Sequence, residues 1–413
     1  MDDLLVRNHN PKGFSNPKAV FLFNCAIMVQ HGIILLLVGP VVPNIMSTFG
    51  VGEATTGILL GLGSLGFAAG PLAAGIIIDR GSVRGAIIIG FVIEIGFLLL
   101  FGLSRVFVIA VVANAFLHFG SAFIEISGSY LPIISPGSSR GHVRMNLIHA
   151  FFSVGAFVGP FLVGIYVGAS GKWQPVFYFA LVPTVILLIW AIMLRPRMAT
   201  APPGDHAPAE KNSAVKREKA SLIAVLRNRW VVFGALALLF YVGAEVGVSS
   251  WIVYYLQQVM GVDTVKSAAG LSILWIFIMV GRYLNSILGN RLSAKFLVSG
   301  SGIGGFFGVV IFLFVKELSL AYVLLAWIGL CFSGVFPNVM GELNNRDPKR
   351  AGMVTAVMTM GAAIGAAVFQ WVVGLVADFV HLKAALSIPA VLQLFVVLSF
   401  LLALRSQGVS KGK

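Results

Sequence analysis

Charged residues are scarce in this chain: Asp, Glu, Lys and Arg make up 11% of its 413 residues, against about 25% in soluble domains. It has only two cysteines, Cys25 and Cys331, each inside an apolar run, so the sequence offers no disulfide framework. The phosphate-binding pattern G-x-x-x-x-G-K-[ST] is missing, which argues against ATP-driven chemistry within this chain. The sequence shows no motif of an enzyme, and we expect the protein not to be one.

Long runs of apolar residues are the main feature of the chain. Hydrophobic residues make up 58% of the chain, and the mean hydropathy is +0.95. A helix needs about 20 apolar residues to cross a bilayer, whereas barrel strands alternate over about ten. The runs here do not alternate, and the first is too long for a signal peptide. The sequence therefore predicts an all-α integral membrane protein with twelve spans, at residues 19–46, 53–78, 85–104, 106–134, 145–169, 174–194, 229–257, 266–290, 296–315, 318–341, 351–378 and 384–404.

The chain divides into two similar halves. Pro, Ala and charged residues fill the stretch after the sixth predicted span, which is typical of a linker. Three glycines of the fifth span, Gly155, Gly159 and Gly168, recur in the eleventh at one constant offset. We therefore predict two pseudo-symmetric six-helix bundles, 1–195 and 228–413, joined by a linker at 196–227, with a site between them near the membrane midplane.

Basic residues predict the orientation. Most Lys and Arg side chains fall in the N-terminal tail, the linker, the C-terminal tail and the loops on the same side, and few fall on the other. By the positive-inside rule, both termini and the linker are expected in the cytoplasm of a plasma-membrane protein. The net charge of +14 is then a topology signal, and nucleic acid is not needed to explain it.

Two carboxylates interrupt the spans. Glu125 lies in FIEISGSYLP and Glu245 in YVGAEVGVSSW. A charge at the bilayer centre costs about 2.5–3.5 kcal/mol, so intramembrane ionisable groups usually serve function. Counting from Arg229 places Glu245 in the outer half of the membrane. Each carboxylate could instead be structural, hydrogen-bonded to a neighbouring helix.

A loop motif suggests a family. GIIIDRGSVRG ends the second span, with Gly75, Asp79, Arg80 and Arg84. Gly75 would allow close helix approach, and the charges would form a latch at the cytoplasmic mouth. This stretch resembles the G-x-x-x-D-R-x-G-R-R motif of the major facilitator superfamily, although Val83 stands where an arginine is common. An ordinary positive-inside loop is the alternative.

Several other stretches resemble one branch of that superfamily, the fucose–galactose–hexose/proton symporters. They are GPVVPNI, FIEISGSYLP, MNLIHAFFSVGAFVGP, YVGAEVGVSSWIVYYL and GVFPNVMGELNNRDP. The resemblance implies that Glu125 is a cavity carboxylate in proton-coupled sugar binding. A neutral Glu125 could donate a hydrogen bond to a sugar hydroxyl, and an ionised one could only accept, which would link affinity to protonation. The branch's first-span acidic residue is replaced by Gly39, and an asparagine of its fourth span by Ser129.

Other polar and aromatic residues are candidates for the cavity. His31 could carry a proton or be a buried neutral histidine. Its neighbour Gln30 points about 100° away, so at most one of the two faces the cavity squarely. We expect Glu94 in the third span to be structural, and Arg282 to snorkel or latch near a span end. Further candidate liners are Asn114, His118, His149, Tyr241, Gln257 and Asn338, with Trp251 and Trp275 as stacking platforms for a sugar and Arg144 among the gating residues.

These features predict a secondary active transporter that imports a monosaccharide with a proton by alternating access. It would work as a monomer in the lipid bilayer, with no cofactor besides the coupling proton. A drug or metabolite/proton antiporter is the alternative. GAFVGPFLVG is similar to an antiporter motif but departs at Val163, and the fourth span lacks the embedded arginine of such antiporters. A non-transporting receptor, which would bind a solute without flux, is a third class.

Overall fold

The computed structural model describes residues 17–80, 82–134, 141–194, 225–289, 291–347 and 350–406. These residues form helices, and twelve segments are long and apolar enough to cross a membrane, as predicted. Side chains on the outside are apolar, as expected for contact with lipid; Leu72 and Met193 are examples. The expected linker lies mostly outside the described residues, so the domain boundaries stay a prediction.

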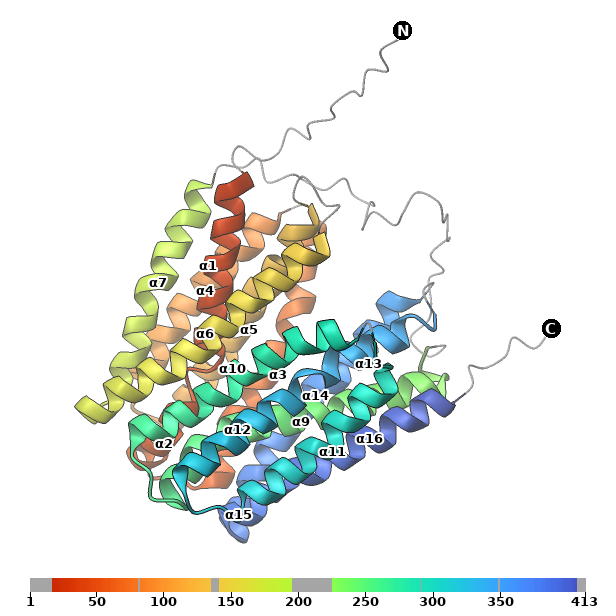
Figure 1. Ribbon diagram of the computed structural model, residues 1–413. Coiled ribbons are helices and arrows are strands. Elements are labelled where there is room, and N and C mark those ends of the chain that lie inside the picture. The colour runs from red at the N-terminus through yellow and green to blue at the C-terminus, as the bar shows by residue number, and fades with distance from the viewer. Residues whose placement is uncertain are drawn as a thin grey trace, which may run out of the picture.

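The first bundle packs α1 on α6, α3 on α5, and α4 on both α5 and α7 (Figure 1). Its helices are α1 (Pro17–Leu35), η1 (Gly39–Val41), α2 (Val42–Phe49), α3 (Glu53–Asp79), α4 (Val83–Leu103), α5 (Phe107–Ile134), α6 (Gly141–Ser170) and α7 (Gln174–Met193).

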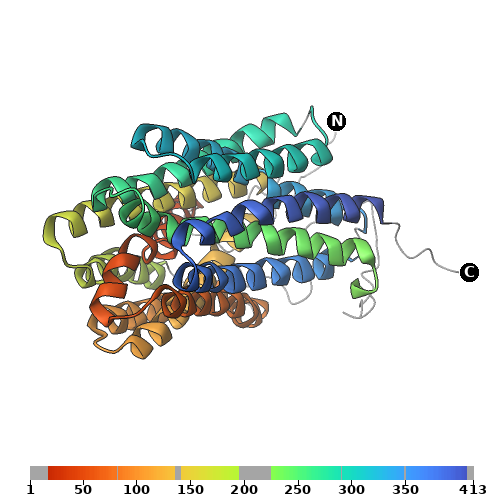
Figure 2. The same ribbon diagram turned by 90° about the horizontal axis from the view of Figure 1, so that it is seen from below.

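The second bundle packs α9 on α14 and α16, α10 on α12, and α11 on α12 and α16. Figure 2 shows its green and blue helices running side by side. They are α9 (Arg229–Gln258), α10 (Thr264–Leu288), α11 (Ala294–Phe312), α12 (Leu318–Ser333), α13 (Val335–Asn344), α14 (Ala351–Phe379), α15 (Leu382–Ala385) and α16 (Ser387–Arg405).

Two spans predicted as continuous helices are interrupted. The first stops at Leu35 and resumes through η1 and α2, where Pro40 and Pro43 lie. The tenth breaks at Gly334, between α12 and α13. Pro337 has no N–H to give the carbonyl one turn before it, which is the carbonyl of Ser333. The average hydropathy detects both spans but does not detect these breaks.

The two bundles touch along a seam at one end of the molecule. We call this end the loop face; the terminal face is the opposite end, where α1 begins and α16 ends. The seam joins α3 to α14 and α6 to α10. A Cβ atom at Gly61 would lie 2.7 Å from the carbonyl oxygen of Ala367, and one at Gly164 would lie 2.4 Å from the Cβ of Ala268. Glycine at these positions therefore allows the backbones to meet.

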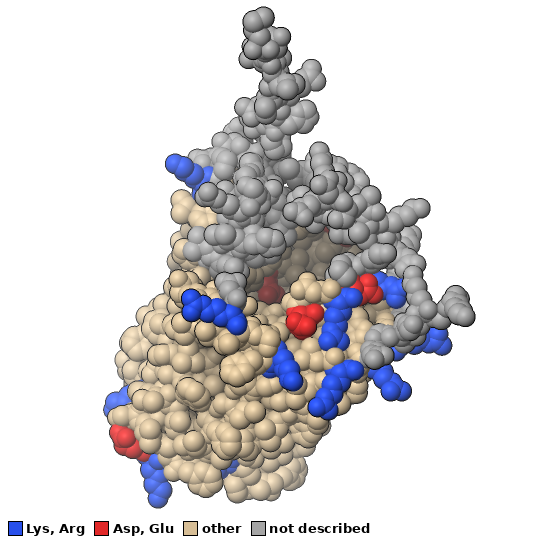
Figure 3. Space-filling view, turned by 45° about the vertical axis from the view of Figure 1, so that its right-hand side comes forward, with Lys and Arg blue, Asp and Glu red and all other residues tan. Residues whose placement is uncertain are grey.

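Polar contacts also cross the seam. Tyr254 Oη donates to Glu53 Oε1 at 2.7 Å, and Ser272 Oγ donates to the carbonyl of Phe157 at 2.8 Å. All these residues lie in the loop-face halves of their helices. Toward the terminal face the bundles diverge (Figure 1), and the surface between them is hollowed (Figure 3). The fold therefore holds a central space that is closed at the loop face and open at the terminal face.

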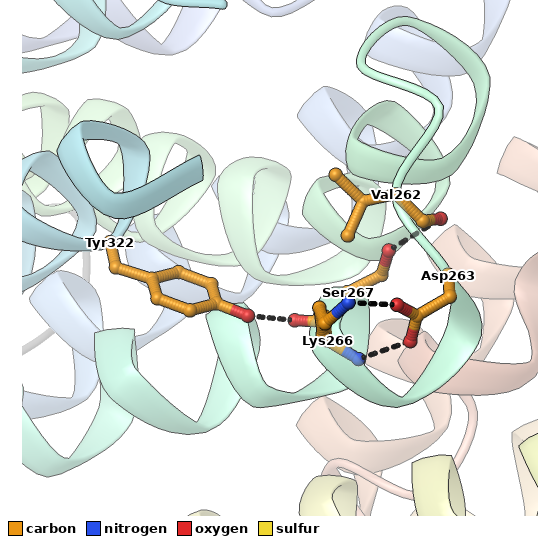
Figure 4. Close-up of polar contacts among 5 residues, drawn as sticks. All are labelled: Val262, Asp263, Lys266, Ser267 and Tyr322. Carbon is orange, nitrogen blue, oxygen red and sulfur yellow. Dashed lines mark hydrogen bonds and ion pairs between the residues drawn. The ribbon is translucent and has the colours of Figure 1, made fainter. Parts of the chain in front are cut away.

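A cluster of polar contacts fixes the start of α10 beside the seam (Figure 4). Asp263 caps the helix by accepting from the N–H of Lys266 at 3.0 Å, and its carboxylate pairs with Lys266 Nζ at 2.9 Å. The backbone hydrogen bond from Lys266 holds the pKa of Asp263 below its usual range. Ser267 Oγ donates to the carbonyl of Val262, and Tyr322 Oη donates to that of Lys266 at 2.7 Å. These contacts tie α12 to the first turn of α10.

Candidate functional site

Arg282 of α10 is the charged centre of the space between the bundles. Its guanidinium acts electrostatically on Glu125 of α5 and His149 of α6, which belong to the first bundle. It also acts electrostatically on Tyr241 and Glu245 of α9, which belong to its own bundle. Arg282 is half-buried, and the groups on which it acts lie on three other helices. Its expected role as a snorkelling or latching residue stays a prediction.

Glu245 has a fixed partner on its own helix. Tyr241, one turn earlier, donates its hydroxyl to Glu245 Oε1 at 2.7 Å, and both side chains are buried. Arg282 also acts electrostatically on the Tyr241 side chain. Glu245 is the seventeenth of the 30 residues of α9, so it lies just past the middle of the helix, and its expected place in the outer half of the membrane stays a prediction.

Glu125 faces Arg282 from the opposite bundle. It is the nineteenth of the 28 residues of α5, on the terminal-face side of the seam. Its side chain is half-buried, in contrast to that of Glu245. One guanidinium therefore acts on two carboxylates from opposite bundles, of which one accepts from a tyrosine and the other is half-buried.

A cluster of buried aromatic rings packs across the two bundles near these charges. His31 of α1 lies against Phe67, with ring centroids 6.0 Å apart, and against Phe152, at 5.2 Å. Phe152 in turn meets Trp275 of α10 edge-on at 5.9 Å, across the two bundles. The indole N–H of Trp275 has no hydrogen-bond partner among the described residues. His149 lies close enough to act electrostatically on His31, which joins the ring cluster to the charged centre.

Two candidates on the first bundle point into its interior. Gln30 donates to Thr184 Oγ1 at 2.6 Å and to the carbonyl of Ala180 at 3.2 Å, both on α7. Asn114 donates to the carbonyl of Leu59 on α3 at 2.8 Å. These amides join helices within one bundle. Of the neighbours Gln30 and His31, it is therefore His31 that lies toward the site.

Three further candidates also lie apart from the charged centre or have no described contact to it. Trp251 is wholly buried and donates to the carbonyl of Gln370 on α14 at 3.1 Å. Asn338 donates to the carbonyl of Gly334 at 2.6 Å, at the break between α12 and α13. Ser129 is half-buried on α5. Their expected roles in binding stay predictions.

Most of the expected gating residues lie where α3 ends and α4 begins. Arg84 donates from Nε to the carbonyl of Ala191 at 2.9 Å, and from its guanidinium to that of Ile192, at the end of α7. Asp79 and Arg80 are exposed at the end of α3. A Cβ at Gly75 would meet nothing within 4 Å, so the expected close helix approach is absent where the bundles diverge. The side chain of Arg144 lies outside the described part of the structure.

The sequence prediction missed the centre of the site. Arg282 was assigned to a gate, and Phe152 was not singled out at all. The signal for Arg282 was present, because it is a basic residue inside a predicted span, just as Glu125 and Glu245 are acidic residues inside predicted spans. Within the described ranges, no cluster of three or more His, Cys, Asp or Glu residues could hold a metal ion.

The profile of the Major Facilitator Superfamily matches residues 21–370. The chain belongs to this superfamily. It is a multi-pass membrane transporter, and the resemblance seen in the loop motif is confirmed. Its structure is similar to a crystal structure of a bacterial homologue of the human lysosomal transporter Spinster, in an inward-facing and occupied conformation. The TM-score is 0.77 at 15% identity, over 95% of this chain and 98% of the other, so the likeness is one of fold.

Curated relatives are distant and of more than one kind. A glucose/galactose transporter of Brucella abortus is 24% identical over 81% of this chain and 82% of its own length. A putative glucose/galactose transporter of Helicobacter pylori is 23% identical, and the match covers 59% of this chain and 61% of that protein. The fosmidomycin resistance protein of Escherichia coli is 23% identical over 78% of each chain.

Proposed function

We propose that this transporter imports a monosaccharide, or a similarly small polyhydroxy solute, together with a proton. It would work by alternating access, as a monomer in the plasma membrane. The observation that carries the proposal is that the guanidinium of Arg282 acts electrostatically on both Glu125 and Glu245, which come from opposite bundles. The net charge of these three side chains changes when either carboxyl binds a proton. Because the side chains come from both bundles, they come together only in particular relative positions of the bundles.

Sugar binding is supported by the chemistry of this centre. Carboxylates and a guanidinium offer acceptors and donors for several hydroxyl groups, and hydrogen bonds to charged groups contribute about 1.5–3 kcal/mol each. Trp275 adds an apolar face and an unpartnered N–H. The names of the Brucella and Helicobacter relatives agree with a hexose as cargo.

Proton coupling is assigned to Glu125. Its side chain is half-buried, and it lies on the terminal-face side of the seam, where the two bundles diverge. When Glu125 is ionised it competes with substrate for Arg282, and when it is neutral it can donate to a sugar hydroxyl while Arg282 is free to do the same. Substrate and proton then favour each other's binding, which is the requirement for symport.

The terminal face is assigned to the cytoplasm. Lys and Arg side chains gather beside the hollow on this face (Figure 3), as the positive-inside rule requires of a cytoplasmic surface. With that orientation, the closed seam at the loop face makes this conformation inward-open.

A drug or metabolite/proton antiporter is the second candidate. The fosmidomycin resistance relative favours it. So does Arg282, because a guanidinium in the central space would attract an anionic cargo. The two functions differ in the direction in which protons move when substrate is added.

The test is proton movement in proteoliposomes that enclose a pH-sensitive dye. External D-glucose or D-galactose should acidify the interior, and Glu125→Gln should abolish the signal. Glu317→Gln, at an exposed carboxyl on the loop face, is the matched control and should behave as wild type. Internal alkalinisation on adding substrate, or pH-driven movement of fosmidomycin with silence for every sugar, would replace symport by antiport.

A further inference from the structure

A second carboxyl group is buried in the first bundle, away from Arg282. Glu94 of α4 is 0% exposed, and neither of its oxygens has a hydrogen bond of normal geometry among the described residues. The sequence suggested a structural role for Glu94, but a structural carboxyl satisfies its oxygens with donors. Neither oxygen of Glu94 has a donor at normal hydrogen-bond geometry in the described part of the structure, and the transport mechanism above does not use this residue.

Close packing of α4 on α5 brings Glu94 to Ser121. A Cβ at Gly90 would lie 3.0 Å from the carbonyl oxygen of Gly120, and one at Gly120 would lie 2.8 Å from Ile93. The two helices therefore approach each other at the turns that hold Glu94 and Ser121. The Ser121 side chain is close enough to act on the carboxyl of Glu94.

Ser121 also contacts the histidine of the candidate site. Its Oγ lies 2.8 Å from Nδ1 of His31, and both residues are buried. When the imidazole carries its proton on Nε2, Ser121 donates to Nδ1 and its oxygen can accept from Glu94. The hydroxyl thus stands between the buried carboxyl and a ring that touches Phe152 and lies near His149.

Electrostatics indicate which of these three groups carries the proton at rest. No cation acts on Glu94 among the described residues, and an unpaired charge at the bilayer centre costs about 2.5–3.5 kcal/mol. We therefore expect Glu94 to hold a proton in this conformation. His31 is faced by His118 of α5 and His149 of α6, so positive charge on either histidine would oppose its protonation.

We propose that Glu94, Ser121 and His31 form a proton relay that stores the coupled proton behind the substrate site. This inference rests on the proton coupling proposed above. In the transfer, the O–H bond of Glu94 breaks as its proton moves to Ser121 Oγ, and the Ser121 proton moves to Nδ1 of His31. Glu94 becomes a carboxylate, Ser121 is unchanged, and His31 becomes an imidazolium beside His149; the reverse transfer restores the resting state.

The relay assigns different tasks to Glu94 and Glu125. Glu125 would exchange its proton with water in the hollow, whereas Glu94 would exchange only through His31. A positive charge on His31 would repel the positive charge of Arg282, since His149 interacts with both. The stored proton would therefore change the electrostatic potential at Arg282 without contacting the substrate. Glu94 and Ser121 are therefore positioning and proton-carrying groups that should not affect substrate contacts.

The test separates proton-driven transport from exchange. Wild type, Glu94→Gln and Ser121→Ala are reconstituted, with Ser127→Ala as the control, since Ser127 is also a buried serine of α5. Uptake of D-galactose driven by a pH gradient should fall by about a hundredfold in Glu94→Gln and Ser121→Ala, since groups that transfer protons contribute about 10²–10⁴-fold. D-galactose exchange at equal pH should stay close to wild type in all variants.

Other results would overturn the relay. Driven uptake that survives in Glu94→Gln would do so, and so would a parallel loss of driven uptake and exchange with a lower thermal midpoint, which would mark a structural residue. If wild type moves no protons with any sugar, the proposed function fails while the relay is still testable. Infrared difference spectra should then show a protonated carboxyl band that disappears in Glu94→Gln and shifts in Ser121→Ala, and an unchanged band in both variants would refute it.

Discussion

The glycines of the seam should control the equilibrium between the two ends of the transport cycle. In Gly61→Ala, the new methyl group would lie 2.7 Å from the backbone oxygen of Ala367, and backbone cannot move aside as a flexible side chain can. The clash exists only while the loop face is closed. We therefore expect the substitution to favour conformations in which α3 and α14 have separated.

The size of the effect follows from packing energetics. Overpacking a close contact costs about 1–3 kcal/mol, which changes the ratio of closed to open loop face by about 5- to 140-fold at 1.4 kcal/mol per tenfold. Alanine also favours the helix by roughly 0.5–1 kcal/mol relative to glycine, but it does so in both conformations, so this contribution cancels.

The assay is a distance measurement between spin labels at Lys172 and Glu317, which are exposed at the loop face on different bundles. The two native cysteines are buried and free, and would be replaced to leave two labelling sites. Wild type should show mainly a short distance, and Gly61→Ala should add or enlarge a long one. Gly75→Ala is the matched control, because a Cβ there meets nothing within 4 Å. An identical distance distribution in Gly61→Ala and Gly75→Ala would refute the packing explanation.

Substitutions at three other residues give separate tests. Tyr254→Phe removes the hydrogen bond to Glu53, which should weaken the closed seam by about 0.5–1.5 kcal/mol and lengthen the same label distance less than Gly61→Ala does. Asp263→Ala removes the cap of α10 and should lower stability by about 1 kcal/mol at pH 7. Because the pKa of Asp263 is lowered by Lys266, this stabilisation is present above the ordinary pKa of about 3.9 and is lost as the pH falls through the lowered value, so thermal midpoints of variant and wild type should converge in acid. Trp275→Ala should weaken D-galactose binding, measured by calorimetry, by about two- to tenfold if stacking contributes about 0.5–1.5 kcal/mol, and Trp275→Phe should weaken it less.

The spans were predictable because membrane insertion depends on length and apolarity, which the sequence states directly. The interruptions were not, because they depend on single prolines that a hydropathy average does not register. The break at Gly334 is an example. Apolar residues continue on both sides of it, but Pro337 leaves the carbonyl of Ser333 without its donor.

The site was predictable in its components and less so in its arrangement. Intramembrane charge pointed to Glu125 and Glu245, and Arg282 acts electrostatically on both. The polar residues Gln30 and Asn114 were proposed on the same reasoning, yet they join helices within a bundle. Which side of a membrane helix faces the cavity depends on its neighbours, and a span that is apolar all round carries no amphipathic signal of its own.

The central charges also suggest why one carboxylate would carry the proton and the other would not. One guanidinium cannot fully compensate two carboxylates in a space of low dielectric constant. Glu245 has a second source of stabilisation, because Tyr241 donates to it at 2.7 Å from the same helix and moves with it. Glu125 depends on Arg282, which belongs to the other bundle, so its compensation changes whenever the bundles move relative to each other. We therefore infer that alternating access itself changes the proton affinity of Glu125 while leaving that of Glu245 nearly constant. A pH titration of substrate affinity should accordingly lose its pH dependence in Glu125→Gln and keep it in Glu245→Gln.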